Sequence, residues 1–245
     1  MRDNSNKFIA FLAIIATPFA LGAFLLTWAP SQQYANDDPT HDGYVPPRSI
    51  QNLVEKTQQS TVTVWCDASS KNSMLGTAWA VNLGTDVKTN LPTTLITNHH
   101  VIKGCLKGKG KLTIALPGKD TVKAVILKWD VENDLAVIAS HLKLPPLKLS
   151  EYGPWPGYWV MAMGSADGYE GSVAFGNVLN STDTSVLITN NLSHGNSGGP
   201  LVDNEGNVVG VSSWGSETEQ YNGAKSLDAF CAKILTCEGH TWWAP

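Results

Sequence analysis

Residues 61 to 214 form a series of short runs rich in valine, isoleucine, threonine and aromatic residues, separated by glycine, proline, asparagine and aspartate. Such runs are typical of strands joined by tight turns. The first set comprises Thr61–Trp65, Gly76–Asn82, Thr93–Asn98, Leu112–Leu116, Val122–Trp129 and Leu135–Ser140. The second set comprises Tyr158–Met163, Gly171–Leu179, Ser185–Asn190, Pro200–Asp203 and Val208–Trp214. About six strands on each side of the proline-rich segment Leu142–Pro156 predict an all-β fold of two packed antiparallel barrels.

A helix is predicted on each side of the two barrels. Ser49–Gln58 carries Ile50, Leu53 and Val54 on one helical face, and Ser226–Leu235 carries a second apolar stripe as a C-terminal helix. With 245 residues the chain has room for one two-lobed domain, predicted at residues 48–245, and for no further folded domain.

The N-terminal part of the chain is predicted to be a membrane anchor. Phe8–Trp28 is an uncharged, almost wholly apolar run of 21 residues, which is long enough to cross a bilayer as a helix. Arg2 and Lys7 precede it and Asp37 and Asp38 follow, so the positive-inside rule keeps residues 1–7 in the cytoplasm and exports the rest. Residues 29–47 are polar and proline-containing, which predicts an extended linker. The alternative is a cleaved signal peptide, whose apolar region is usually shorter.

Charge and histidine placement argue against two other functional classes. The formal net charge is −4 and there is no basic stripe or phosphate-cradling loop, so no nucleic-acid partner is expected. His41, His141 and His240 are too scattered for a metal-ligand motif, and no metal or other cofactor is expected. The oligomeric state is left open.

The stretch most suggestive of chemistry is Ser193-His194-Gly195-Asn196-Ser197-Gly198-Gly199-Pro200. Small and turn-forming residues around Ser197 allow a tight bend, which can aim two backbone N–H groups into one concavity suited to an oxyanion. The Ser197 hydroxyl is then a candidate nucleophile, provided that a base lies near it. The alternative is an ordinary tight hairpin.

A serine nucleophile needs an imidazole to take its proton and a carboxylate to orient that imidazole. His100 lies at the end of one predicted strand, and Asp134 at the start of another. Each alone is more often structural, but the order His, Asp, Ser at strand ends favours a catalytic triad. His99 and Asp130 are the competing candidates for base and carboxylate.

Taken together, these motifs resemble those of the trypsin-like serine proteases, and specifically the Deg/HtrA-type branch. The resemblance extends to Gly76-Thr77-Ala78-Trp79 and to Val160-Met161-Ala162-Met163-Gly164, and it covers residues 50–235. It implies a serine-type endopeptidase with two β-barrels, an active site in the cleft between them, and a protein or peptide as substrate. The alternatives are a catalytically silent protease-like binding or sensor protein, and an ester hydrolase, which would need a strand–turn–helix elbow at the serine.

The resemblance also implies a role for each motif. Ser197 would be the nucleophile, His100 the general base and Asp134 the residue that orients His100. The backbone N–H groups of Gly195 and Ser197 would form the oxyanion hole.

Six further residues are implied to contact the substrate. The segment Ser213-Trp214-Gly215 resembles the one that pairs with the substrate backbone as an added strand. Asn191 and Leu192 fall where the pocket for the P1 side chain is built, and they carry no carboxylate, so an apolar P1 is expected rather than Lys or Arg. His194 is predicted either to line the cleft or to be a solvent-facing turn residue.

The sequence departs from the family pattern in several ways, including His99 beside the base and Ser165-Ala166 after Gly164, and two departures concern regulation. Asn196 stands where trypsin-type zymogens have an aspartate that pairs with a freed N-terminus, so that route to activation is expected to be closed. No PDZ domain follows the protease region, so regulation through such a domain is expected to be absent.

The four cysteines allow three pairings. Cys66 lies just past a strand of the first barrel and Cys105 lies soon after His100, while Cys231 and Cys237 flank the end of the last predicted helix. We expect disulfides Cys66–Cys105 and Cys231–Cys237, which an exported domain would allow. The alternative is four buried thiols.

Overall fold

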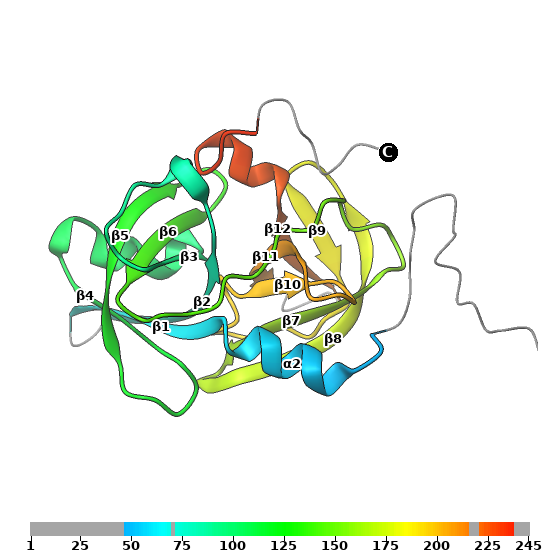
Figure 1. Cartoon of the computed structure of the whole chain (residues 1–245), viewed down its shortest axis with the longest axis horizontal. Helices are drawn as coiled ribbons and strands as arrows, with labels where there is room; N and C mark the ends of the chain where they lie inside the picture. The colour runs from blue at the N-terminus through cyan, green and yellow to red at the C-terminus, as the bar shows by residue number, and fades with distance from the viewer. Residues whose placement is uncertain (1–46, 70–71, 216–220, 238–245) are drawn as a thin grey trace, which may run out of the picture. The chain divides into compact units, whose positions relative to one another are not determined.

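Two closed antiparallel β-barrels form the body of the chain in a computed structural model that describes residues 47–69, 72–215 and 221–237 (Figure 1). The first barrel has the strand order β1-β2-β3-β6-β5-β4 and the second β10-β11-β12-β9-β8-β7. The first barrel comprises β1 (Thr61–Ser69), β2 (Asn72–Val81), β3 (Thr93–Thr97), β4 (Lys111–Ala115), β5 (Val122–Asp130) and β6 (Leu135–Ser140). The second comprises β7 (Trp159–Ala166), β8 (Tyr169–Ser181), β9 (Ser185–Ile188), β10 (Pro200–Val202), β11 (Val208–Gly215) and β12 (Asn222–Ser226).

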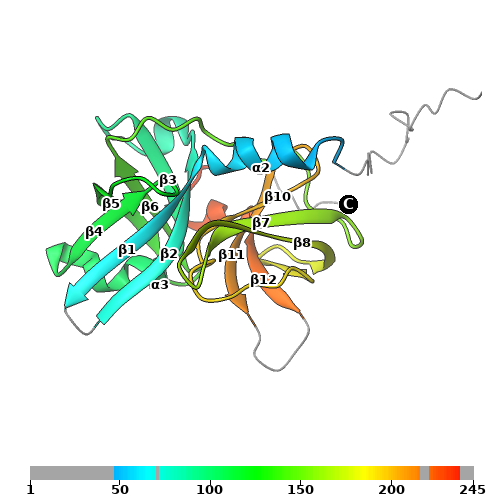
Figure 2. The same ribbon diagram turned by 90° about the horizontal axis from the view of Figure 1, so that it is seen from below.

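The remaining elements are short. Two α-helices and three 3-10 turns are described: α2 (Ile50–Gln58), η1 (Gly84–Asp86), α3 (His99–Ile102), η2 (Lys103–Gly108) and η3 (Asp228–Ala232). Helix α2 begins after Ser49, whose Oγ accepts a hydrogen bond from the Asn52 N–H. It lies along the barrels in both views (Figures 1 and 2), and the Gln58 side chain donates to the Gly171 carbonyl of β8.

The two-barrel architecture is therefore confirmed, and the eleven expected strands correspond to β1 to β11 with small shifts of their ends. The twelfth strand, β12, has the sequence Asn-Gly-Ala-Lys-Ser, without a β-branched or aromatic residue, so no sequence pattern marks it. It is a strand because β9 and β11 pair with it from both sides and the second barrel closes through it.

The predicted C-terminal helix over Ser226–Leu235 is wrong. Ser226 is the last residue of β12, and the next regular element is the 3-10 turn η3. The Cα atoms of Cys231 and Cys237 are 5.5 Å apart, whereas six residues of continuous α-helix would separate them by about 9 Å, so the disulfide excludes only a helix that runs on to Cys237.

The predicted anchor Phe8–Trp28 and nearly all of the linker lie outside the described residues. Among the residues that the structure describes, no helix is long and apolar enough to span a membrane.

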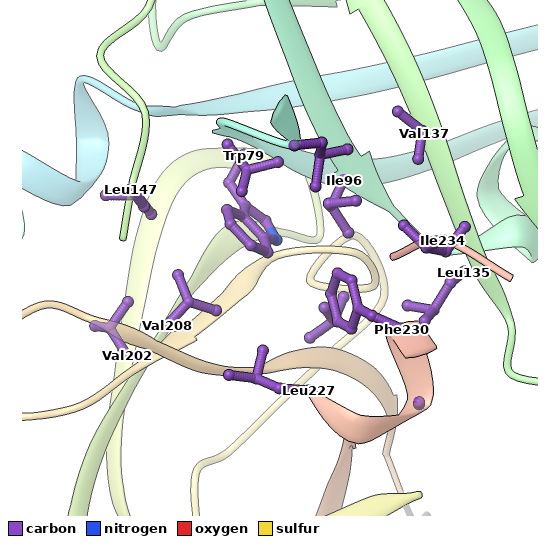
Figure 3. Close-up of a cluster of buried hydrophobic side chains, with 14 of the residues drawn as sticks. Trp79, Ile96, Leu135, Val137, Leu147, Val202, Val208, Leu227, Phe230 and Ile234 are labelled. Atoms are coloured by element: carbon purple, nitrogen blue, oxygen red, sulfur yellow. The ribbon is translucent and has the colours of Figure 1, made fainter. Parts of the chain in front are cut away.

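The largest apolar core joins the two barrels. Trp79 and Ile96 from the first barrel, Val202 and Val208 from the second, and Phe230 from the C-terminal segment belong to one cluster of buried side chains. Figure 3 shows them gathered between the strands and the C-terminal segment. Each barrel also has its own apolar interior. The shared cluster fixes how the barrels sit against each other, and the strand ends at their junction build the site.

The cysteines are joined in the expected pairing, Cys66–Cys105 and Cys231–Cys237. The first bridge ties β1 to η2, which directly follows the helix carrying His100, and both of its cysteines are buried. The second closes a small loop after β12.

We expect the two bridges to stabilise the fold unequally, because a longer closed loop loses more entropy in the unfolded chain. Replacing Cys66 and Cys105 together by alanine should lower the free energy of unfolding by about 4 kcal/mol, and replacing Cys231 and Cys237 by about 2 kcal/mol. Urea unfolding followed by circular dichroism measures both. Equal losses would contradict the loop-entropy argument, and alkylation of all four cysteines in the native protein would contradict the bridges.

Candidate active site

A cleft of about 660 Å³ opens between the two barrels. Most of the residues predicted to bind or cleave a substrate line this cleft. Asn191 and Asp134 are not among the described lining residues, and Asp134 reaches the cleft only through its contact with His100. The lining residues are Met74 and Leu75 of β2, His100 of α3, Asp167 between β7 and β8, Leu192 to Ser197, and Ser213 to Gly215 of β11.

His100 and Asp134 form a close pair. His100 Nδ1 lies 2.7 Å from Asp134 Oδ2, and the backbone N–H of His100 donates to Asp134 Oδ1 at 2.8 Å. The Ser213 hydroxyl donates to Asp134 Oδ2 at 3.0 Å. The Asp134 carboxylate therefore binds His100 at both its ring and its backbone N–H, and Ser213 of the second barrel binds the carboxylate.

Asp134 adopts a left-handed backbone conformation with φ +54°. For a residue other than glycine this costs about 1 kcal/mol, and such strain persists only where the surroundings enforce it. Here the Asp134 carbonyl accepts hydrogen bonds from the Asn98 side chain at 2.8 Å and from the His99 N–H at 3.2 Å. The short turn between β5 and β6 thereby aims the Asp134 side chain at α3.

Two opposing effects set the pKa of Asp134. Burial raises the pKa, but the hydrogen bonds from His100 and Ser213, with the charge interaction of His100, outweigh burial and hold the Asp134 pKa below its ordinary value. The group is therefore a carboxylate at neutral pH, and it acts only as a hydrogen-bond acceptor. An acceptor facing Nδ1 selects the imidazole tautomer with its proton on Nδ1 and leaves Nε2 unprotonated.

The competing candidates occupy different positions. His99 bonds to Asp134 through its backbone N–H, and no hydrogen bond joins its ring to Asp134 among the described residues. Burial lowers the pKa of the His99 ring, which favours its neutral form. The Asp130 carboxylate is fully buried and accepts from the Glu132 N–H at 3.0 Å, from Asn133 Nδ2 at 2.6 Å and from Lys233 Nζ at 3.2 Å. Asp130 therefore shapes the turn that presents Asp134.

Ser197 lies in the same cleft as His100. Its Oγ donates to the Ser213 carbonyl at 3.3 Å, and no hydrogen bond joins it to the imidazole within the described residues. Catalytic hydrogen bonds are commonly long or misaligned before a substrate binds.

The loop around Ser197 has its carbonyl groups fixed by hydrogen bonds. The His194 carbonyl accepts from the Asp167 N–H at 2.6 Å, and the Asn196 carbonyl accepts from the Gly199 N–H at 3.0 Å. In a trans peptide the carbonyl and the N–H point in opposite directions, so these bonds aim the N–H groups of Gly195 and Ser197 the other way. Neither N–H has a hydrogen-bond acceptor in the described part of the chain. Donors of this kind can bind an oxyanion.

Gly195 and Gly198 have φ of +95° and +87°, so this loop needs glycine at both positions. A side chain at Gly195 would also collide with the Ser165 carbonyl. These constraints account for the glycines that mark the motif in the sequence.

Sequence reasoning missed two features of the site. Asp167-Gly168 forms the two-residue turn between β7 and β8, with φ of +48° and +88°, and its Asp167 N–H fixes the His194 carbonyl. An Asp-Gly pair between two strands is a strong hairpin signal, which could have located the turn. The bond from the Ser213 hydroxyl to Asp134 has no such sequence signal, because the two residues lie in different barrels.

Two antiparallel barrels with a histidine–aspartate pair and a glycine-rich serine loop in their cleft define the chymotrypsin-like class of serine hydrolases. Residues 76–211 match the model of the trypsin-like peptidase domain, so the chain belongs to this family and is a homologue of the HtrA and DegP serine proteases. The family resemblance noted in the sequence is thereby confirmed.

The relatives cover the chain to different extents. Human serine protease HTRA3 is 28% identical over 179 residues, which is 66% of this chain and 39% of that protein. A probable periplasmic serine endoprotease DegP-like from Pseudomonas savastanoi pv. phaseolicola is 34% identical over 129 residues, 49% of this chain and 26% of that protein. The chain therefore spans about two fifths or less of the length of these relatives.

Solved structures share the fold. The active form of the Rv3671c protease from M. tuberculosis has a TM-score of 0.63 at 21% identity, covering 74% of this chain and 83% of that one. The serine endoprotease from Yersinia pestis has a TM-score of 0.63 at 23% identity, covering 74% of this chain and 64% of that one.

The buried turn predicts a pH dependence of stability. Although burial raises the pKa of Asp130, the hydrogen bonds from Asn133, Lys233 and Glu132 outweigh it and place the Asp130 pKa below its ordinary value. As the pH falls through the ordinary value of about 3.9, the unfolded chain is protonated first, so the protein loses stability down to the folded pKa.

Asp130→Asn should lower the free energy of unfolding at pH 7 and lose less additional stability between pH 5 and pH 3 than the wild type. Urea titrations across this range measure the difference. Parallel curves for the two proteins would show that Asp130 has the same pKa in the folded and unfolded states.

Proposed function

We propose that the chain is a serine endopeptidase that hydrolyses peptide bonds through an acyl-enzyme intermediate. The observation that carries this proposal is the joint placement in one cleft of a carboxylate-bound imidazole, a serine hydroxyl and two N–H groups that have no acceptor among the described residues. These are the groups that acyl transfer to serine requires.

The mechanism follows from these groups. Ser197 Oγ attacks the scissile carbonyl carbon while His100 Nε2 takes the hydroxyl proton, and the Oγ–carbon bond forms as the carbonyl π electrons move to its oxygen. The N–H groups of Gly195 and Ser197 bind that oxyanion. When the intermediate collapses, the carbon–nitrogen bond breaks and His100 gives its proton to the leaving amine. Water then attacks the acyl-enzyme in the same way, with His100 again as base.

Asp134 supports each proton transfer through its bond to Nδ1. The carboxylate keeps Nε2 facing Ser197 in the neutral imidazole and stabilises the imidazolium that forms after proton transfer. Ser213 supports Asp134 from the opposite barrel.

The substrate is proposed to lie along the end of β11. Ser213, Trp214 and Gly215 line the cleft there, and Leu192 and His194 line the same cleft. A side chain at Gly215 would meet the Asn222 side chain and the Leu192 carbonyl, so a larger residue there would shift the segment that lines the cleft. The exposed end of β11 is proposed to pair with the substrate as an added strand. Positions 191 and 192 carry no carboxylate, which favours an apolar P1 side chain. Asn191 is still proposed to contact the P1 side chain, although it is not among the described residues that line the cleft.

The protease domain is proposed to act outside the cytoplasm. Two disulfides support this location, since such bridges persist in oxidising compartments, and the name of one relative includes the word periplasmic. The anchor at residues 8–28, with residues 1–7 in the cytoplasm and a linker at 29–47, would hold domain 48–245 near the membrane.

The triad predicts a kinetic pattern. Ser197→Ala or His100→Ala should each lower kcat by about a million-fold, and the double variant little more, because the two groups act as one unit. Asp134→Ala should lower kcat by about ten-thousand-fold. The measurements are cleavage of a peptide library by purified protein and labelling by a serine-directed fluorophosphonate, with circular dichroism to verify folding.

His99→Ala is the matched control for His100→Ala, and it should keep kcat within about tenfold because its ring is not bonded to Asp134. Loss of activity in His99→Ala with retention in His100→Ala would show that the base is misassigned. Folded wild-type protein that is neither labelled at Ser197 nor cleaves any peptide would instead support a catalytically silent binding protein.

The proposed anchor makes a separate prediction. A reporter active only outside the cytoplasm and fused after Pro245 should be active, and the protein should sediment with membranes and retain residues 1–28. A mature form that begins after residue 22 or 35 would indicate a cleaved signal peptide while leaving export intact.

A further inference from the structure

Thr77 connects the first barrel to the serine loop of the second barrel through two hydrogen bonds. It lies in β2 and is completely buried. Its backbone N–H donates to the Ser197 carbonyl at 2.8 Å, and its hydroxyl donates to the Gly195 carbonyl at 2.7 Å. Thr77 therefore contacts the carbonyl groups of both residues whose N–H groups form the oxyanion site.

Thr77 is also linked to the strand that leads to the base. Its own carbonyl accepts a hydrogen bond from the Thr97 hydroxyl at 2.7 Å, and Thr97 is the last residue of β3, just before the helix that carries His100. One buried residue thus sets the serine loop relative to both its own strand and the histidine-bearing strand.

The hydroxyl matters because no other donor among the described residues reaches the Gly195 carbonyl. Gly195 has no side chain and φ +95°, so its neighbouring peptide units rotate more freely than those of other residues. The unit before Gly195 is fixed by the Asp167 N–H, and the unit after it by the Thr77 hydroxyl. Without the second bond, the buried Gly195 carbonyl loses its donor, and a buried carbonyl without a donor favours any rotation that returns it to water. Such a rotation disturbs the oxyanion site.

We propose that Thr77 is a positioning residue for the oxyanion hole, acting through its side-chain hydroxyl. This inference rests on the proposed peptidase function. It assigns to a buried strand residue, which touches no substrate, a share of the transition-state stabilisation that the Gly195 and Ser197 N–H groups provide.

The test compares Thr77→Val, which keeps the shape but removes the hydroxyl, with Thr77→Ser, which restores it. Thr77→Val should lower kcat by about ten- to a hundredfold, less than the loss of an oxyanion donor itself, with KM within about twofold. Affinity for a peptide aldehyde that forms an oxyanion on Ser197 should fall by the same factor. Thr77→Ser should recover kcat to within about threefold.

Thr93→Val is the matched control, because Thr93 is a buried threonine of β3 whose hydroxyl also donates to a loop carbonyl, that of Leu142, at 2.6 Å. It should lower the melting temperature without changing kcat or aldehyde affinity. If Thr77→Val does the same, Thr77 is merely structural and the inference is wrong. If Thr77→Val does not fold, Thr77→Cys, with its weak S–H donor, should give a kcat between those of wild type and the expected Thr77→Val value.

Failure of the proposed function gives a different pattern. A wild-type protein that neither cleaves peptides nor reacts with fluorophosphonate would refute the peptidase, whatever the variants do. A crystal structure of Thr77→Val then decides the inference without turnover, since a rotated Gly195 peptide supports it and an unchanged one overturns it.

Discussion

The contact between the two barrels is the constraint on which the rest of the molecule depends. The imidazole and the carboxylate come from strand ends of the first barrel, and the serine loop comes from the second. Apolar packing around Trp79 and Phe230 holds the barrels together, but it is not directional. Hydrogen bonds between the barrels, from Thr77 to the serine loop and from Ser213 to Asp134, add the directional constraint.

Strain at Asp134 shows how this precision is maintained. Its left-handed backbone costs about 1 kcal/mol, whereas each hydrogen bond that it accepts contributes about 1 kcal/mol net. Asp134 accepts five hydrogen bonds. Two come from the backbone N–H and the ring Nδ1 of His100, one from the Ser213 hydroxyl, one from the Asn98 side chain and one from the His99 N–H. Because they converge on one residue, the conformation that suits the imidazole is also the one of lowest free energy.

Local patterns marked the residues that the structure brings together in the cleft better than they marked the residues that support them. His100, Asp134 and Ser197 each lie in a short segment whose composition is dictated by its backbone, as with the glycines at positive φ beside Ser197. Thr77, in contrast, looks like any buried strand threonine, because its partners in the serine loop are more than a hundred residues away. Strand β12 is extended because β9 and β11 pair with it on both sides. Most of the apolar residues expected to line a C-terminal helix are instead buried in and around a 3-10 turn, which leads into the disulfide Cys231–Cys237.

The late position of β12 and Lys233 in the chain has a consequence for the order of events during synthesis. The second barrel closes only when Asn222–Ser226 pairs with β9, and the buried carboxylate beneath the Asp134 turn meets its cation only when residue 233 has emerged. Ser197, His100 and Asp134 are all made earlier than these two supports. A nascent chain therefore carries the proposed reactive groups before it carries the framework that aligns them, and the site is complete only after residue 233 has emerged.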